Sequence, residues 1–220
     1  MAMSLAFHIV FAVIGMAMPL LMLMAEGLWL RTGDRLYRTL AERWARGAAI
    51  MFAVGAVSGT ALSFELGLLW PKFMEHAGPI IGMPFSLEGL AFFLEAIFLG
   101  LYFYGWDRIS RTAHFLCGVA VLVSGTASGI LVVCANAWMN HPTGFDLVNG
   151  LPTNIDPLAA MMNPGSFSQA LHMTIAAFQS VGFAVAGIHA FMLLREPGNR
   201  FHHIAVNIAL LVGGVSALLQ

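Results

Sequence analysis

Ionisable side chains inside apolar segments are the residues of this sequence most able to do chemistry. His8, Glu65, Glu88 and His172 each lie in a long apolar stretch. A charge near the middle of a bilayer costs at least ~2.5–3.5 kcal/mol, so such residues are functional candidates by default. Neutral imidazole is a common axial ligand of haem iron, and a carboxylate can also bind iron. Spacing alone leaves open a haem site, a metal-ion site or a proton relay.

Glu95 follows Glu88 by seven residues, which is close to two helical turns. The two carboxylates then lie on nearly the same helix face, about 10 Å apart along the axis. At mid-bilayer Glu95 is a candidate proton carrier. The alternative is a structural hydrogen bond to a neighbouring helix. The possible partners are Ser124, Thr126, Ser128 and Asn136.

The composition indicates that these residues sit in a membrane protein. The chain has 220 residues, of which 59% are hydrophobic and 10% are charged. Soluble proteins carry about 25% charged residues, so most of this surface is expected to face lipid. A net charge of -1 argues against a strongly basic nucleic-acid binder. The two cysteines are 17 residues apart in one apolar segment, too far for a disulfide.

Six apolar segments are long enough to span a bilayer, which takes ~20 residues. Backbone polar groups must be satisfied within each segment, so every one is predicted to be helical. The predicted spans are about 5–30, 47–69, 84–106, 113–139, 167–194 and 203–220. We therefore predict an all-α polytopic bundle forming one domain over residues 1–220. No basic residue precedes Arg31, so the first span is interpreted as a membrane helix rather than a secretory signal.

The basic residues predict the orientation of the bundle. Nine of the ten Lys and Arg residues fall in the connections after the first, third and fifth spans, and only Lys72 falls on the other side. The positive-inside rule makes the first side cytoplasmic and puts the N-terminus outside. His8, Glu65, Glu88 and His172 are then expected in one layer near the outer face. The outer connections 71–83 and 140–166 are rich in Pro and Gly and are predicted to be loops.

The remaining ionisable residues near helix ends are predicted to be interfacial. Glu26 and Asp107 lie near cytoplasmic ends beside arginines and are expected to form ion pairs or a proton entrance. The histidines predicted to be interfacial are His76, His114, His141, His189, His202 and His203.

Two motifs resemble a known family. The run Ser86-Leu-Glu-Gly-Leu-Ala-Phe-Phe-Leu-Glu95, followed by Gly105-Trp-Asp-Arg108, is similar to the most distinctive stretch of cytochrome bd ubiquinol oxidase subunit I. The run Asn136-Ala-Trp-Met-Asn-His-Pro142 also resembles a motif of that family. The resemblance covers essentially all 220 residues, and it looks closer to the cyanide-insensitive branch.

The resemblance implies a terminal respiratory oxidase that oxidises quinol and reduces O2 to water, with protons taken from the cytoplasm. It implies a low-spin haem b, a high-spin haem b and a haem d, or a further haem b in its place. The implied partners are oxidase subunit II, a small single-helix subunit, quinol, O2 and membrane lipid. The implied location is the bacterial cytoplasmic (inner) membrane, as a multi-pass protein.

The resemblance also implies roles for individual residues. His172 would bind the iron of the low-spin haem b, and His8 would bind a high-spin haem iron. Glu88 would lie at the oxygen-reducing haem as a cofactor-binding or catalytic residue, and Glu95 would be catalytic in proton transfer. The implied proton route comprises Glu95, Ser128 and Asp107.

The sequence departs from the family pattern in length. Subunit I is normally about twice as long, with nine helices, and the quinol-binding loop and later helices of that pattern are not in this sequence. The chain is therefore expected to be the N-terminal part of a longer subunit and to be inactive alone. Two other readings are a cofactor-free proton- or ion-coupled transporter using Glu65, Glu88 and Glu95, and a dihaem electron-transfer anchor. The anchor is disfavoured because His8 and His172 together supply only one bis-histidine haem.

Overall fold

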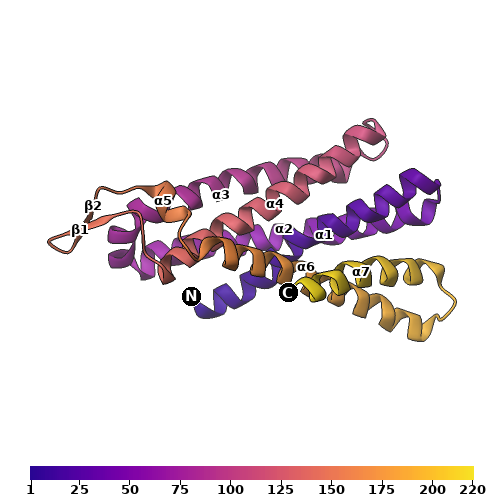
Figure 1. The fold of residues 1–220 in the computed structure, drawn as a ribbon. Coiled ribbons are helices and arrows are strands. Elements are labelled where there is room, and N and C mark those ends of the chain that lie inside the picture. The colour runs from indigo at the N-terminus through magenta and orange to yellow at the C-terminus, as the bar shows by residue number, and fades with distance from the viewer.

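A computed structural model describes all of residues 1–220, and it consists mainly of long helices (Figure 1). In chain order the elements are α1 (Ala2–Thr32), α2 (Arg35–Leu69), α3 (Pro71–Gly105), α4 (Arg111–Asn140), β1 (Asp146–Val148), β2 (Leu151–Thr153), α5 (Pro157–Met161), α6 (Ser166–Arg195) and α7 (Arg200–Leu219). Six helices are long and apolar enough to cross a membrane, namely all except α5. The prediction of an all-α bundle with six spans is confirmed.

Short polar signals set the helix boundaries at the basic end of the bundle. The Asp34, Ser110 and Asn199 side chains cap α2, α4 and α7 by accepting backbone N–H groups. Such caps satisfy donors that the first helical turn leaves free. Gly33 ends α1 in the left-handed conformation, with φ of 72°. Only two residues therefore separate α1 from α2.

The helices run antiparallel, so that the three basic connections gather at one end of the molecule. The α1–α2, α3–α4 and α6–α7 connections lie at the right of Figure 1, and the β1–β2 hairpin lies at the opposite end. This arrangement agrees with the grouping of basic residues on one side. We refer to the end with the three connections as the basic end and to the other as the hairpin end.

The predicted outer loop at 71–83 is wrong, because these residues form the first third of α3. Pro71 stands in the first turn, where its missing N–H costs no helical hydrogen bond. Pro79 and Pro84 lie further inside the helix. This part of α3 is held by a small core cluster consisting of Ala77, Ile80, Ile81, Ala135, Trp138 and Ala160. Likewise, most of the predicted connection 31–46 is the start of α2.

The segment between α4 and α6 is a loop, as predicted, with two short elements inside it. β1 and β2 pair antiparallel, with Val148 opposite Leu151. Asn149 and Gly150 between them both have positive φ, 55° and 80°, as a tight hairpin turn requires. Asn163 is 4% exposed, and its amide donates to the Cys134 carbonyl of α4. The loop is thereby fixed to the hairpin end of the bundle.

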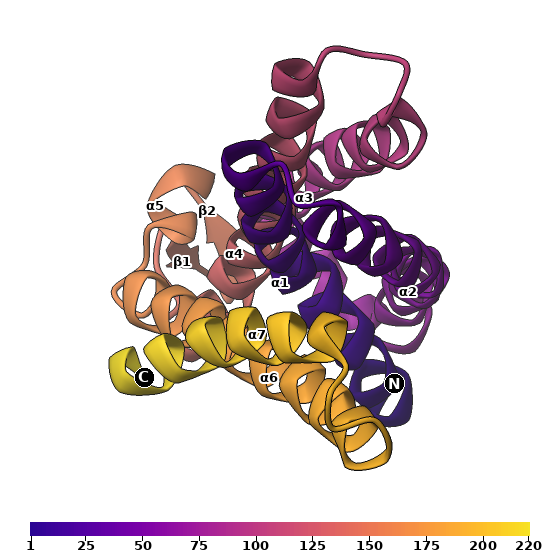
Figure 2. The same cartoon turned by 90° about the vertical axis from the view of Figure 1, so that its right-hand side faces the viewer.

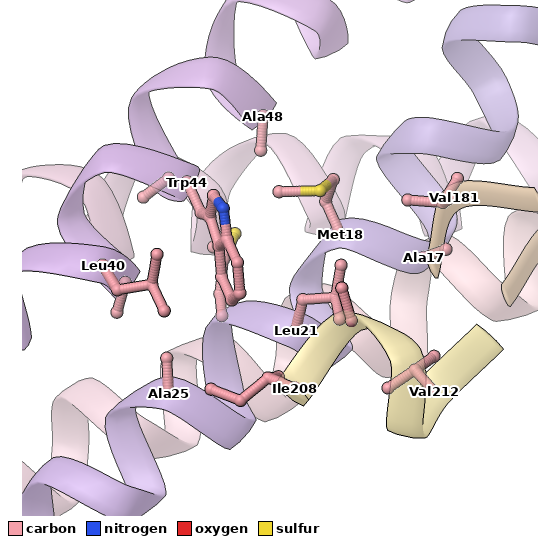
Figure 3. Close-up of a cluster of buried hydrophobic side chains, with 14 of the residues drawn as sticks. Ala17, Met18, Leu21, Ala25, Leu40, Trp44, Ala48, Val181, Ile208 and Val212 are labelled. Atoms are coloured by element: carbon pink, nitrogen blue, oxygen red, sulfur yellow. The ribbon is translucent and has the colours of Figure 1, made fainter. Parts of the chain in front are cut away.

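The main core surrounds α1, which lies between α2, α4, α6 and α7 (Figure 2). Leu21, Ala25, Leu40 and Ala41 are fully or almost fully buried. Figure 3 shows side chains from α1, α2, α6 and α7 converging on this cluster. Within the apolar stretches, 44% of α1 residues but only 6% of α2 residues are buried. The helix α2 therefore presents an apolar surface to its surroundings, as expected beside lipid.

Candidate functional site

Three of the predicted site residues and one predicted proton carrier meet in a small cavity. His8 of α1, Glu88 and Glu95 of α3, and Ser128 of α4 all line a cavity of about 90 Å³. The rest of its lining is aromatic, aliphatic or glycine: Phe11, Ala12, Gly15, Met16, Phe52, Gly55, Ala56, Phe92, Gly125 and Gly129. Two carboxylates and an imidazole therefore share one largely apolar space among four helices.

The His8 ring is oriented by α2. Its Nδ1 lies 3.0 Å from the Ser58 hydroxyl, which in turn donates to the Val54 carbonyl at 2.9 Å. Because the single hydroxyl proton of Ser58 goes to the helix backbone, the hydroxyl accepts from His8 Nδ1–H. The other ring nitrogen, Nε2, then carries a lone pair. A histidine held in this way is suited to bind a metal through Nε2.

Close packing at glycine makes room for the His8 ring. A Cβ added at Gly59 would lie 2.9 Å from His8 Cε1. Real Cβ atoms do not approach so closely, so this position favours glycine. Ser58 and Gly59 were not predicted as site residues, since neither residue type marks a site by itself.

The two carboxylates of α3 differ in their hydrogen bonding. Glu88 is half-buried and accepts a hydrogen bond from the Ser128 hydroxyl at 3.1 Å. Glu95 is 5% exposed, and no hydrogen bond joins it to another protein group. A Cβ at Gly125 would lie 2.9 Å from Glu95 Oε1. Ser128, which we considered as a partner of Glu95, is instead bound to Glu88.

His172 lies apart from this cavity, near the start of α6. Its side chain is exposed and contacts the Gln220 amide at the end of α7. Met173, the next residue, approaches the same glycine of α4, Gly129, as Met16 of α1 does. His172 is therefore at a similar level along the bundle but on another side. His172 does not line the cavity with His8 and Glu88, because α6 packs on α1, α4 and α7 rather than on α3.

Glu65 also lies outside the cavity. It accepts a hydrogen bond from the Ser4 hydroxyl at 2.7 Å, near the hairpin end of α1 and α2. Glu65 follows Ser58, the partner of His8, by seven residues, which is about 10 Å along α2. The predicted single layer of four groups is therefore wrong for Glu65. The transporter hypothesis requires Glu65, Glu88 and Glu95 to lie in one layer. In the structure Glu65 is separate from the other two.

Asp107 is at the basic end, distant from the other members of the predicted proton route. It follows Glu95 by twelve residues, about 18 Å along the α3 direction. Its carboxylate accepts a hydrogen bond from Arg38 at 2.7 Å and is exposed. The Arg38 guanidinium lowers the pKa of Asp107 below its ordinary value. Asp107 is thus an ionised surface group paired with arginine. Of its two predicted roles, an ion pair or a proton entrance, the ion pair is confirmed.

One histidine predicted to be interfacial, His114, is buried, and two others, His189 and His202, form contacts between helices. His114 is 2% exposed and contacts Glu26, which is fully buried, so Glu26 pairs with a histidine rather than with arginine. His189 of α6 contacts His202 of α7 at 2.8 Å, and Trp44 of α2 donates to His189 at 3.2 Å. These contacts join residues far apart in the sequence, which is why spacing did not indicate them.

The cavity residues fit the chemistry of a haem-iron site better than that of a bare metal ion. No group of three or more His, Cys, Asp or Glu side chains is placed to hold a metal ion. Haem needs fewer protein ligands, because the porphyrin supplies the equatorial nitrogens. His8 Nε2, the Glu88 carboxylate and the aromatic walls match that need. The cavity of about 90 Å³ is below the ~300–1,000 Å³ of enclosing ligand pockets, so these helices could form only part of the walls.

The fold and this cavity define a class: a polytopic helical membrane protein with an imidazole and two carboxylates inside the bundle. Residues 1–220 match the family model for cytochrome bd terminal oxidase subunit I. The chain belongs to that family of respiratory oxidase subunits, as its motifs predicted.

Relatives and a solved structure agree with this assignment. The chain is 33% identical over 208 residues to cytochrome bd ubiquinol oxidase subunit 1 of Bacillus subtilis (strain 168), covering 94% of this chain and 44% of that protein. It is 30% identical over 198 residues to cytochrome bd-II ubiquinol oxidase subunit 1 of Escherichia coli (strain K12), covering 88% and 38%. The structure of bd oxidase from Geobacillus thermodenitrificans superimposes with a TM-score of 0.94 at 38% identity, covering 98% of this chain and 50% of that one. This chain thus spans half or less of the length of these relatives.

Proposed function

We propose that this chain forms the haem-binding part of a quinol:oxygen oxidoreductase of the cytochrome bd type. The enzyme would oxidise quinol, reduce O2 to water and take protons from the cytoplasm. It would reside in the bacterial cytoplasmic (inner) membrane with oxidase subunit II and a small single-helix subunit. Six membrane-length helices and the subunit I family support this proposal.

The observation that carries the proposal is the shared cavity of His8, Glu88, Glu95 and Ser128. An imidazole with a free Nε2 and two carboxylates stand within one apolar space. That combination offers an iron ligand beside groups that can accept and donate protons. Neither a passive anchor nor a purely structural bundle needs all of these groups at one cavity.

We assign the cavity residues separate roles. His8 would bind a high-spin haem iron through Nε2, with Ser58 fixing the ring through Nδ1. Glu88 would face the same haem, with its carboxylate oriented by Ser128. Glu95 would hold a proton at the side of the cavity nearer the basic end and pass it toward the reacting oxygen. The proposed proton route keeps Glu95 and Ser128, with Asp107 as a surface group at its start.

His172 would serve a different haem. His172, with its exposed ring near the start of α6, would bind the iron of the low-spin haem b. The proposed cofactors are low-spin haem b, high-spin haem b and haem d, or a further haem b in its place. When bound, the haems would supply the redox chemistry that carries electrons from quinol to O2.

The test uses the full-length subunit expressed with subunit II and purified in detergent or nanodiscs. The pyridine haemochrome assay should show haem, and His8→Ala should lose one high-spin haem signal while the low-spin signal stays. His172→Ala should do the reverse. His76→Ala is the matched control, since His76 is exposed at the hairpin end and bonds only to its own helix. Absence of haem from the wild-type complex would contradict the proposal.

A further inference from the structure

A second group of ionisable side chains lies inside the bundle, near its basic end. Glu26 of α1 is fully buried and His114 of α4 is 2% exposed. His114 Nδ1 and Glu26 Oε1 are 2.8 Å apart. Tyr102 of α3, also fully buried, packs its ring against the imidazole with centroids 4.3 Å apart. Three helices therefore enclose one carboxylate–imidazole pair.

The hydrogen bonds of His114 define how many protons the pair holds. His114 Nε2 is 2.9 Å from the Tyr102 backbone carbonyl, which can only accept, so Nε2 carries a hydrogen. One more proton must lie between His114 Nδ1 and Glu26 Oε1 for that contact to be a hydrogen bond. The pair is then either imidazolium and carboxylate or imidazole and carboxylic acid. Both forms have no net charge, which suits a site shielded from water.

The pair also has a place for a further proton. Glu26 Oε2 is buried and has no hydrogen-bond partner among the protein groups, and the same holds for the Tyr102 hydroxyl. A buried carboxylate oxygen without a donor is unfavourable, and a proton on it would neutralise the carboxylate and leave the positive charge on the His114 imidazolium. Oε2 is therefore the atom on which an added proton would be held.

The surroundings of the pair connect it with the basic end. The Trp106 ring lies 4.1 Å from the His114 ring, and Arg38 lies over both Trp106 and Trp29. The titratable or charged groups of the surrounding elements are Arg38 and Glu42 of α2, Tyr102 of α3, Asp107, and Arg111 and Cys117 of α4. Only one aromatic layer separates the pair from the exposed Asp107–Arg38 ion pair.

The pair is not an extension of the cavity at Glu95. Tyr102 follows Glu95 by seven residues, about 10 Å along α3. Buried apolar side chains of three helices, Met22, Leu99 and Val121, lie at intermediate positions along the chain. No hydrogen bond joins the two sites, so the pair is a separate proton-holding position, nearer to the basic end than Glu95 is.

We propose that Glu26 and His114 form a buried proton-holding site that takes up a proton from the basic end. Uptake adds one proton to the pair, giving a Glu26 carboxylic acid and a His114 imidazolium, and release of that proton restores the starting pair. The Tyr102 hydroxyl would accept from or donate to Glu26 Oε2 during the exchange. This site deepens the proposed function, on which it rests, by naming an early acceptor for protons drawn from the cytoplasm.

The decisive variant is Glu26→Gln. Glutamine keeps an oxygen that can accept from His114 Nδ1–H and nearly the same shape, but it cannot take up a proton. Glu196→Gln is the matched control, because Glu196 is an exposed carboxylate at the same end of the molecule. Both are made in the full-length subunit with subunit II, in nanodiscs, and haem content is measured first to show intact assembly.

Infrared pH-difference spectra should show a protonated-carboxyl band in the wild type that is lost in Glu26→Gln and kept in Glu196→Gln. Oxygen consumption on the alkaline limb of its pH profile should fall by roughly 10-fold in Glu26→Gln, because the glutamine cannot hold a proton for transfer. A band and a pH profile unchanged in an assembled Glu26→Gln complex would overturn the inference and leave the pair a structural contact.

A second variant covers the case in which Glu26→Gln does not assemble. Tyr102→Phe removes only the unpartnered hydroxyl and should shift the midpoint of the carboxyl band. An unchanged midpoint would overturn the inference. A wild-type complex that consumes no oxygen would contradict the proposed function instead, while the infrared comparison would still decide the fate of the proton site.

Discussion

Two polar sites lie inside this bundle, and they differ in the space around them. At the cavity, His8 and Glu88 each bind a serine hydroxyl and face an opening of about 90 Å³. Near the basic end, Glu26 and His114 bind each other and are enclosed by aromatic rings. A polar group with a small orienting partner and open space is suited to bind a ligand. A polar pair that fills its own space is suited only to share and exchange protons.

Glycines are used in both places, in different ways. A Cβ at Gly125 would meet the Glu95 carboxylate at 2.9 Å, beside the cavity. A Cβ at Gly118 would meet the Leu23 and Tyr102 side chains at 2.8 Å, beside the buried pair. The first glycine makes room for a carboxyl group and the second for an aromatic ring. Variants at the two sites should therefore have different effects.

The largest effect is expected from Glu95→Gln. The amide cannot carry a proton, and positioned acid–base groups typically contribute 10²–10⁴-fold, so oxygen consumption should fall by roughly 10²-fold or more. Haem content should stay near the wild-type level, because Glu95 is not a proposed ligand. Glu75→Gln, at an exposed carboxylate of the hairpin end, is the control. Normal turnover in Glu95→Gln would show that Glu95 does not transfer protons. The cavity would then be a ligand-binding site only.

Ser58→Ala should weaken haem binding at His8. Groups that orient a metal-binding histidine contribute 10–100-fold to affinity, and Ser58 is the only side chain that bonds to the His8 ring. The measurement is haem retention on dilution, followed by the high-spin absorbance. Ser63→Ala on the same helix is the control, because Ser63 bonds only to the Gly59 carbonyl. Equal retention in both variants would show that the hydroxyl does not hold the ring.

Gly125→Ala and Gly118→Ala should each destabilise the protein by overpacking, at a cost of about 1–3 kcal/mol. Thermal unfolding of the purified complex measures this, and Gly125→Ala should also perturb the haem spectrum. Gly100→Ala is the control, since nothing lies within 4 Å of its added Cβ and alanine favours a helix interior by about 0.5–1 kcal/mol. A spectrum changed by Gly118→Ala but not by Gly125→Ala would reverse the roles of the two sites.

The smallest effect is expected at the surface, from Asp107→Asn. Because Arg38 lowers the pKa of folded Asp107, this carboxylate stabilises the fold above its unfolded pKa of about 4. The contribution is lost as the pH falls through the lower folded value. The thermal unfolding temperature at pH 7 should thus be slightly lower in Asp107→Asn than in the wild type. This difference should vanish at strongly acidic pH. A difference that persists there would mean that the ion pair is not its source.

Particular residues show which parts of the fold the sequence could predict. The membrane-spanning helices and the side of the membrane on which each arginine lies could be predicted. The reason is that a lipid bilayer requires long helices and that arginines lie outside its apolar core. The start of α3 at Pro71 was not predicted, since proline suggested a loop. The packing of Ala77 and Ile80 with Trp138, which holds this part of α3, was not visible in the sequence. Asn149-Gly150 did carry a hairpin signal, which was noted only as part of a turn-rich loop.

The candidate site was predictable in residue type but only partly in grouping. His8, Glu88 and Glu95 were identified because ionisable groups are costly in an apolar segment. The depth of these residues in the membrane followed from the direction of each helix. The sequence did not show toward which neighbouring helix each side chain points. His172 and Glu65 were therefore placed in the same group, although α6 carries His172 away from the cavity and Glu65 lies about 10 Å further along α2 than Ser58.

By itself, the sequence determined a helical membrane bundle, its basic end and its costly intramembrane groups, since these follow from the transfer of residues between water and lipid. The tertiary structure decided which groups meet: His8 with Ser58, Glu88 with Ser128, and Glu26 with His114. The reason is physical. Depth in a bilayer is a property of one helix, whereas contact depends on how several helices are rotated and packed against one another.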